Sequence, residues 1–161
     1  MKNTSILTLL VGTVLLAPAG AAPYDPQLHE TLGRTYSPKE SLSKFELSPG
    51  FHLEQVATEP LINEPVLVTW DGNGQMYVAE MNRYMQDIDG KNQLDPVCQV
   101  VQLRDTNNDG IMDQRIVFAD KLILPRMVQC IDDWVVIRET NTLDLYGYRD
   151  TDGDGVSDEK K

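Results

Sequence analysis

Short segments of alternating or continuous apolar residues begin at Phe51 and recur along the rest of the chain, and turns rich in Asp, Asn and Gly separate them. A period of two indicates half-buried β-strands, and short apolar runs between turn signals are typical of buried ones. The sequence therefore predicts an all-β fold. We expect strands over residues 51–57, 65–70, 75–81, 99–104, 114–119, 126–131, 134–138 and 143–148.

The order of these segments repeats. The four predicted strands between residues 65 and 119 form one up-and-down unit, and the same pattern restarts near Arg126. Four-stranded antiparallel units of this kind are the blades of β-propellers. The sequence predicts an incomplete β-propeller over residues 46–161, with one blade at about 61–120 and a second, truncated blade at about 121–161. Because a propeller ring needs about four to eight blades, we expect an N-terminal fragment whose partners are the remaining propeller blades or a downstream domain.

Two acidic loops, Asp105–Asp113 and Asp150–Asp158, carry the most specific chemistry in the chain. Each has oxygen-bearing side chains at positions 1, 3, 5 and 9 and a glycine at position 6, as a Ca²⁺ loop requires. The sequence predicts two Ca²⁺ sites. Their ligands would be Asp105, Asn107, Asp109 and Asp113 with the carbonyl of Ile111, and Asp150, Asp152, Asp154 and Asp158 with the carbonyl of Val156.

Neither loop is a complete EF-hand, because position 12 holds Ile116 in the first loop and Lys161 in the second. The flanking segments predict strands, so each loop is expected to be the turn of a hairpin. A plain polar turn is the alternative, but it needs one or two such residues and not four alternating oxygens twice. The first residues of the loops lie 45 positions apart, and about 40 to 45 residues is the length of one four-stranded blade.

The amino terminus resembles a cleavable secretory signal. Lys2 precedes an apolar run from Ile6 to Leu16, and small residues follow it. We expect a signal peptide at residues 1–22, an extended leader at 23–45, and a secreted or periplasmic protein without a membrane span in its mature chain. Export would expose the loops to extracellular calcium. We expect the loops to bind it with a dissociation constant of about 10⁻⁴ to 10⁻³ M.

The cysteines bear on a possible disulfide, and the net charge bears on the binding partners. Cys98 and Cys130 could form a disulfide in an oxidising compartment, or remain two buried thiols. The net charge of −11 argues against nucleic acid and anionic membranes as partners.

Five segments of this chain carry a resemblance to a known family. They are Pro49–Pro60, Met76–Met81, Asp105–Asp113, Val117–Asp120 and Asp150–Asp158. Together they resemble the opening of a family of secreted bacterial propellers described as membrane-bound dehydrogenases, which is similar to PQQ-dependent sugar or sorbosone dehydrogenases. The resemblance implies oxidation of a sugar-like small molecule, with a cytochrome c domain further along in some members. It also implies that the catalytic His and the PQQ-binding residues lie in later blades, so that this fragment alone would not bind PQQ.

The best local candidates for a ligand pocket are Glu80, Arg83 and Tyr84, where a predicted strand enters the long loop 82–97. Loops at one end of a scaffold commonly form its ligand site. The alternative is an ion pair beside a packed tyrosine. Two functions stay open on the sequence: the start of a quinoprotein dehydrogenase, and a non-catalytic calcium-stabilised propeller that binds glycans or proteins.

Overall fold

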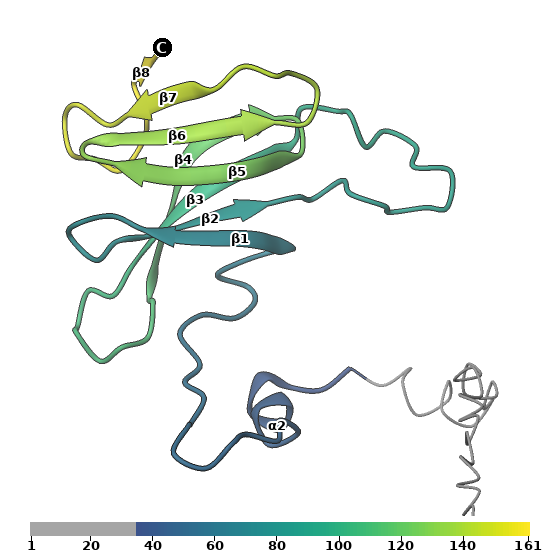
Figure 1. Cartoon of the computed structure of the whole chain (residues 1–161), viewed down its shortest axis with the longest axis vertical. Coiled ribbons are helices and arrows are strands. Elements are labelled where there is room, and N and C mark those ends of the chain that lie inside the picture. Colours follow the sequence, from purple (N-terminus) through teal and green to yellow (C-terminus); the bar gives the residue numbers. More distant parts are fainter. Residues whose placement is uncertain (1–34) are drawn as a thin grey trace, which may run out of the picture. The chain divides into compact units, whose positions relative to one another are not determined.

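A computed structural model of the chain describes residues 35–161 (Figure 1). The predicted signal peptide and most of the predicted leader therefore lie outside the described residues. The chain divides into two units, Met1–Tyr36 and Ser37–Lys161, and the second contains every strand described below. It begins with the short helix α2 (Pro38–Leu42), which Ser37 and Glu40 cap reciprocally through a capping box. No helix among the described residues is long and apolar enough to cross a membrane.

Within residues 35–161, eight strands form two antiparallel sheets, which confirms the predicted all-β class. The first sheet has the order β1 (Pro65–Trp70), β2 (Met76–Glu80), β3 (Cys98–Arg104) and β4 (Gln114–Leu122). The second sheet has the order β5 (Pro125–Ile131), β6 (Trp134–Glu139), β7 (Tyr146–Arg149) and β8 (Glu159–Lys160). The two sheets lie one above the other, with β5 over β1 and β2 (Figure 1).

The predicted strand at residues 51–57 is wrong. This segment belongs to no helix, turn or strand, and no strand among the described residues pairs with it. Its alternation of apolar and polar residues is real, so the pattern alone could not reveal that the hydrogen-bonding partner is missing.

The two sheets repeat each other in register. In the first sheet Pro65 pairs with Glu80, and a bulge separates that pair from the rest of the ladder; in the second sheet Pro125 and Glu139 do the same. These prolines are 60 positions apart (65 to 125), whereas the acidic loops are 45 apart (105 to 150). The difference arises mainly because the β2–β3 connection, residues 81–97, is longer than the β6–β7 connection, residues 140–145. The 45-residue interval is therefore the spacing of the loops and not the length of the whole repeat.

Both faces of the first sheet are buried over its central strands. The face toward the second sheet contributes Tyr77, Ala79, Val100 and Phe118 to a core that Val128, Val135 and Ile137 complete from the other side. The opposite face, called the back of the first sheet below, buries Met76, Val78, Val101 and Leu103 against Ala57, Leu61 and Ile62. Burial of each such side chain contributes roughly 1.5–3 kcal/mol, so both faces stabilise the sheet.

Candidate metal centres

The two acidic loops fold with the same internal hydrogen bonds. In the first loop the carboxylate of Asp105 accepts from the Gly110 amide at 2.8 Å, and Asp109 Oδ1 accepts from the Ile111 amide at 2.8 Å. In the second loop Asp150 accepts from the Gly155 amide at 2.8 Å, and Asp154 Oδ1 accepts from the Val156 amide at 2.7 Å. The position 1 side chain thus holds the position 6 amide, and the position 5 side chain holds the position 7 amide, in both loops.

The far end of each loop is closed in the same way. The carboxylates of Asp113 and Asp158, at position 9, accept a hydrogen bond from the Thr side chain at position 2, at 2.9 and 2.7 Å. Their amides donate to the carbonyls of Arg104 and Arg149, both at 3.0 Å. Each loop therefore closes a β-hairpin, between β3 and β4 or between β7 and β8, as the flanking sequence predicts.

The backbone turns in both loops at positions 4 and 6. Asn108 and Gly110 have φ of 60° and 88°, and Gly153 and Gly155 have φ of 86° and 93°. Glycine adopts this left-handed region without strain, and asparagine tolerates it better than most residues. The residue types at these positions explain why both loops turn in the same way.

The second loop gathers its carboxylates and the first does not. One oxygen from each of Asp150, Asp152 and Asp158 lies within 4.8 Å of the others. Oxygens bound to a common Ca²⁺ at 2.3–2.6 Å lie within about twice that distance of one another, so the spacing fits this ion. Among the described residues this is the single group of three acidic, histidine or cysteine side chains with such spacing. In the first loop the amide of Asn107 instead donates to Asp109 at 3.1 Å.

Hydrogen bonds also favour ionised carboxylates at position 1. The Gly110 amide, followed by the Asp109 amide, holds the pKa of Asp105 below its usual value. At Asp150 desolvation raises the pKa, but the amides of Gly153 and Gly155 outweigh it and the pKa is again lowered. A cation ligand must be deprotonated, so both loops hold their first carboxylate in the form that binds a metal.

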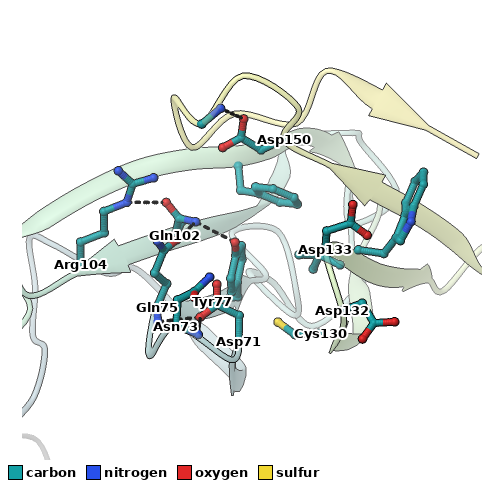
Figure 2. Close-up of a pocket in the computed structure, with 14 residues that line it drawn as sticks. Asp71, Asn73, Gln75, Tyr77, Gln102, Arg104, Cys130, Asp132, Asp133 and Asp150 are labelled. Atoms are coloured by element: carbon teal, nitrogen blue, oxygen red, sulfur yellow. Dashed lines mark hydrogen bonds between the residues drawn. The ribbon is translucent and has the colours of Figure 1, made fainter.

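The second loop also borders a cleft of about 200 Å³ at the same end of both sheets (Figure 2). A buried amide, Gln102, organises one wall: its Nε2 donates to Tyr77 Oη at 2.7 Å and to the side chain of Gln75, and its Oε1 accepts from Arg104 Nε at 2.7 Å. The remaining wall is acidic, with Asp71, Asp132, Asp133 and Asp150. Carboxylates outnumber guanidinium groups here, so the cleft disfavours anions.

Sequence reasoning missed this cleft. Apart from Asp150, its acidic residues come from two turns, Asp71 to Gly74 after β1 and Asp132 to Asp133 after β5, which look like ordinary turns in the sequence. Both turns follow the first strand of their sheet, and this equivalence was the available signal for the cleft. It indicates that the turns lie close together only once the two sheets are known to pack face to face.

The predicted pocket at Glu80, Arg83 and Tyr84 does not form around Glu80. That carboxylate is fully buried and is bound by the Asn63 amide at 2.8 Å and by Arg115 Nη2 at 2.9 Å. The ion pair is thus made with Arg115 of β4. Tyr84 lies apart from it, half exposed beneath the guanidinium of Arg126 at 5.5 Å.

Glu80 has a counterpart in the second sheet. Glu139 pairs with Pro125 as Glu80 pairs with Pro65, and its carboxylate accepts from the Ile123 amide as Glu80 accepts from that of Asn63. Each glutamate fixes the chain just before the first strand of its own sheet. This repetition identifies a structural role for Glu80.

The two cysteines are free thiols, Cys98 buried and Cys130 half-buried. Cys98 lies at the end of β3 beside Gln99, which pairs with Glu80, whereas Cys130 lines the cleft and is hydrogen-bonded to Thr69, near the other end of β1. They therefore lie toward opposite ends of the first sheet, and they form no disulfide. Burial, followed by the charge of Asp71, raises the pKa of Cys130 to about 11.

An all-β domain of two packed antiparallel sheets, each closed by an acidic hairpin loop, is the class that this geometry defines. The chain belongs to the DUF7133 family, a domain of unknown function, whose family model matches residues 37–161. The match begins where the second structural unit begins. No curated protein and no solved structure matches the chain.

Proposed function

We propose that this chain is a calcium-binding part of a secreted β-propeller, in which cations bound by the two hairpin loops stabilise the packing of successive sheets. The observation that carries the proposal is the shared hydrogen-bond pattern of the loops, together with the gathered oxygens of Asp150, Asp152 and Asp158. Three carboxylates in the first loop and four in the second, each set within nine residues, repel one another in the absence of a cation. Ca²⁺ would supply positive charge that offsets this repulsion.

The second loop is the stronger candidate. It has four carboxylates where the first loop has three and an amide, and calcium affinity rises with ligand charge. It also contacts the first sheet, because the Ser157 amide donates to the Phe118 carbonyl at 2.9 Å. Ordering this loop therefore stabilises the contact between the two sheets as well as its own hairpin.

Thermal unfolding in calcium-free buffer and in about 10 mM Ca²⁺ tests the proposal. With a dissociation constant of about 10⁻⁴ to 10⁻³ M, this concentration stabilises the native state by about 1.4–2.7 kcal/mol. Asp150→Asn should remove most of the gain and Asp105→Asn a smaller part. Asp120→Asn, at an exposed carboxylate outside both loops, is the matched control. Equal melting curves with and without calcium would sink the proposal.

The dehydrogenase resemblance concerns a larger protein, and we propose it as the parent activity of this module: oxidation of a sugar-like molecule with PQQ bound by blades outside residues 35–161. The carboxylate of Glu80 already binds Arg115 and the Asn63 amide, which favours a structural role for residues 35–161. Titration of the 161-residue chain with PQQ and Ca²⁺ should leave the quinone absorption spectrum unchanged. Binding to this chain alone would show that the cofactor site lies here, and glycan binding without quinone binding by the parent would favour the non-catalytic alternative.

A further inference from the structure

The back of the first sheet is exposed where the equivalent surface of the second sheet is buried. The shared register makes Val68 of β1 the counterpart of Val128 of β5. Val128 is 3% exposed because the first sheet covers it, whereas Val68 is 44% exposed. Val66 and Trp70 lie on the same side of β1 and are also exposed, at 48% and 51%. Val68 therefore lacks the cover that the first sheet gives to Val128, and Val66 and Trp70 extend the exposed apolar surface on either side of it.

A repeated backbone hydrogen bond shows what would lie next to this surface. The amide at position 8 of the second loop, Ser157, donates to the carbonyl of Phe118 in β4, the outer strand of the preceding sheet. The amide at position 8 of the first loop, Met112, donates at 2.8 Å to the carbonyl of Val56. The carbonyl of Val56 thus accepts from the first loop the hydrogen bond that the carbonyl of Phe118 accepts from the second loop. Since Phe118 belongs to an outer strand, Val56 lies where the outer strand of a preceding sheet would lie.

The segment around Val56 has the properties of an unpaired strand. Residues 51–57 belong to no helix, turn or strand, and the amides of residues 52–57 donate no hydrogen bond to any described residue. Phe51 and Leu53 alternate with polar residues and are 75% and 44% exposed. Backbone with free donors and acceptors can pair with the edge of another sheet.

We propose that residues 51–57 are the outer strand of a third antiparallel sheet, whose other strands come from outside the described residues and cover the back of the first sheet. The partner is thus a β-sheet with an unpaired outer edge and an apolar face, which packs on Val66, Val68 and Trp70. The surface continues the existing contact of Met76 and Val78 with Ala57 and Leu61. The inference rests on the proposed propeller arrangement and does not depend on calcium or on any enzymatic activity.

The second sheet of another copy does not fit this place. Position 10 of the loops is Gln114 in the first sheet and Glu159 in the second. Phe118 follows Gln114 by four residues, so if Val56 is the counterpart of Phe118, His52 is the counterpart of Gln114 and therefore of Glu159. The strand β8 (Glu159–Lys160) already pairs with β7 there. Residues 51–57 of a neighbouring copy would have to displace it.

Amide exchange and a strand peptide test the proposal on the 161-residue chain. In the first sheet the outer strand β4 pairs with β3. A synthetic peptide of residues 97–104, which contains the β3 sequence, therefore serves as a substitute for the missing neighbour of residues 51–57. Alone, the amides of residues 52–57 should exchange within about tenfold of the unfolded rate. With the peptide at about 1 mM, NMR shifts should concentrate in residues 51–57 and at the Trp70 indole, and a peptide N-methylated at its bonding amides should give none.

Trp70→Lys should weaken peptide binding at least about fivefold, whereas Leu143→Lys, at a side chain 86% exposed in the β6–β7 connection, should leave it unchanged. Protected amides in the isolated chain, shifts confined to other sheet edges, or no shifts at all would overturn the proposal. So would a dimer in sedimentation that Trp70→Lys abolishes, because the occupant would then be a second copy. A failure here leaves the calcium-dependent melting untouched, so the two proposals fail separately.

Discussion

Gly155 is the residue at which the second acidic loop touches the first sheet. A Cβ at this position would lie 2.7 Å from Ile116 Cδ1 and 2.9 Å from both Arg104 Nη2 and Gln102 Oε1. Gly153 has nearly the same positive φ, but nothing lies within 4 Å of its Cβ position. The two glycines therefore separate the effect of backbone conformation from the effect of close packing.

Replacing each glycine by alanine should reveal that difference. Gly153→Ala should cost about 1 kcal/mol of unfolding free energy, the strain of a side chain at positive φ. Gly155→Ala should cost about 2–4 kcal/mol, because overpacking against the first sheet adds to that strain. Urea unfolding of both variants in the absence of calcium measures the two costs. Equal losses would mean that the loop does not rest on the first sheet.

The sequence predicted both loops at the level of single residues because a calcium loop is a local pattern: the oxygens and the glycine lie within nine positions. It could not distinguish Gly110 from Gly155, since the atoms that crowd Gly155 belong to residues about 40 to 50 positions away. The role of Glu80 was out of reach for the same reason. Its charge suggested a ligand site, and its partner Arg115 lies on a strand 35 positions further along.

At the scale of strands, the Glu80–Arg115 pair joins β2 to β4 across β3. The glutamate side chain is fully buried and the arginine side chain is 26% exposed. Glu80→Gln should destabilise the chain by about 2–4 kcal/mol, because it leaves a largely buried guanidinium without its counter-charge. Asp89→Asn, in an exposed pair with Lys91, should cost less than about 0.5 kcal/mol. Chemical denaturation checks both, and a loss below that of Asp89→Asn would contradict the structural role of Glu80.

Strand prediction succeeded where alternation coincided with a partner strand and failed where it did not. Residues 65–70 and 134–138 form β1 and most of β6, because each has an antiparallel neighbour only a short turn away. Residues 51–57 have the same alternation without a neighbour. Alternation reports which side chains face a core, but a strand also requires hydrogen bonds to a second backbone.

At the scale of the whole molecule, the all-β class and the division into two repeating units followed from the sequence, because apolar segments and turns recur in the same order. The sequence predicted only three strands in the second unit and missed β8, which completes a four-stranded sheet. The placement of the cleft did not. It requires the turns after β1 and β5 to lie at the same end of two stacked sheets, and stacking depends on contacts between residues about 60 positions apart.

The stability of the whole molecule should depend on acid pH through the loop carboxylates. In the folded state the pKa of Asp105 is lowered, chiefly by the Gly110 amide, and that of Glu159 is lowered by hydrogen bonds from Lys161 and Arg149. The pKa of Asp150 is lowered by amide hydrogen bonds that outweigh desolvation. A folded-state pKa below the unfolded value of about 4 stabilises the fold above that pH, and this contribution is lost as the pH falls through the folded value.

Calcium should make that dependence steeper, because the same carboxylates must lose their protons before they can bind a cation. Melting temperatures measured from neutral pH down to about pH 3 should therefore fall further in the presence of Ca²⁺ than in calcium-free buffer, and the two curves should converge below the usual carboxyl pKa of about 4. Asp150→Asn should bring the curves closer together at neutral pH as well, because it removes most of the calcium gain. A calcium-dependent difference that persists at pH 3 would mean that the ion is held by groups other than these carboxylates, and the loops would then not be the metal centres.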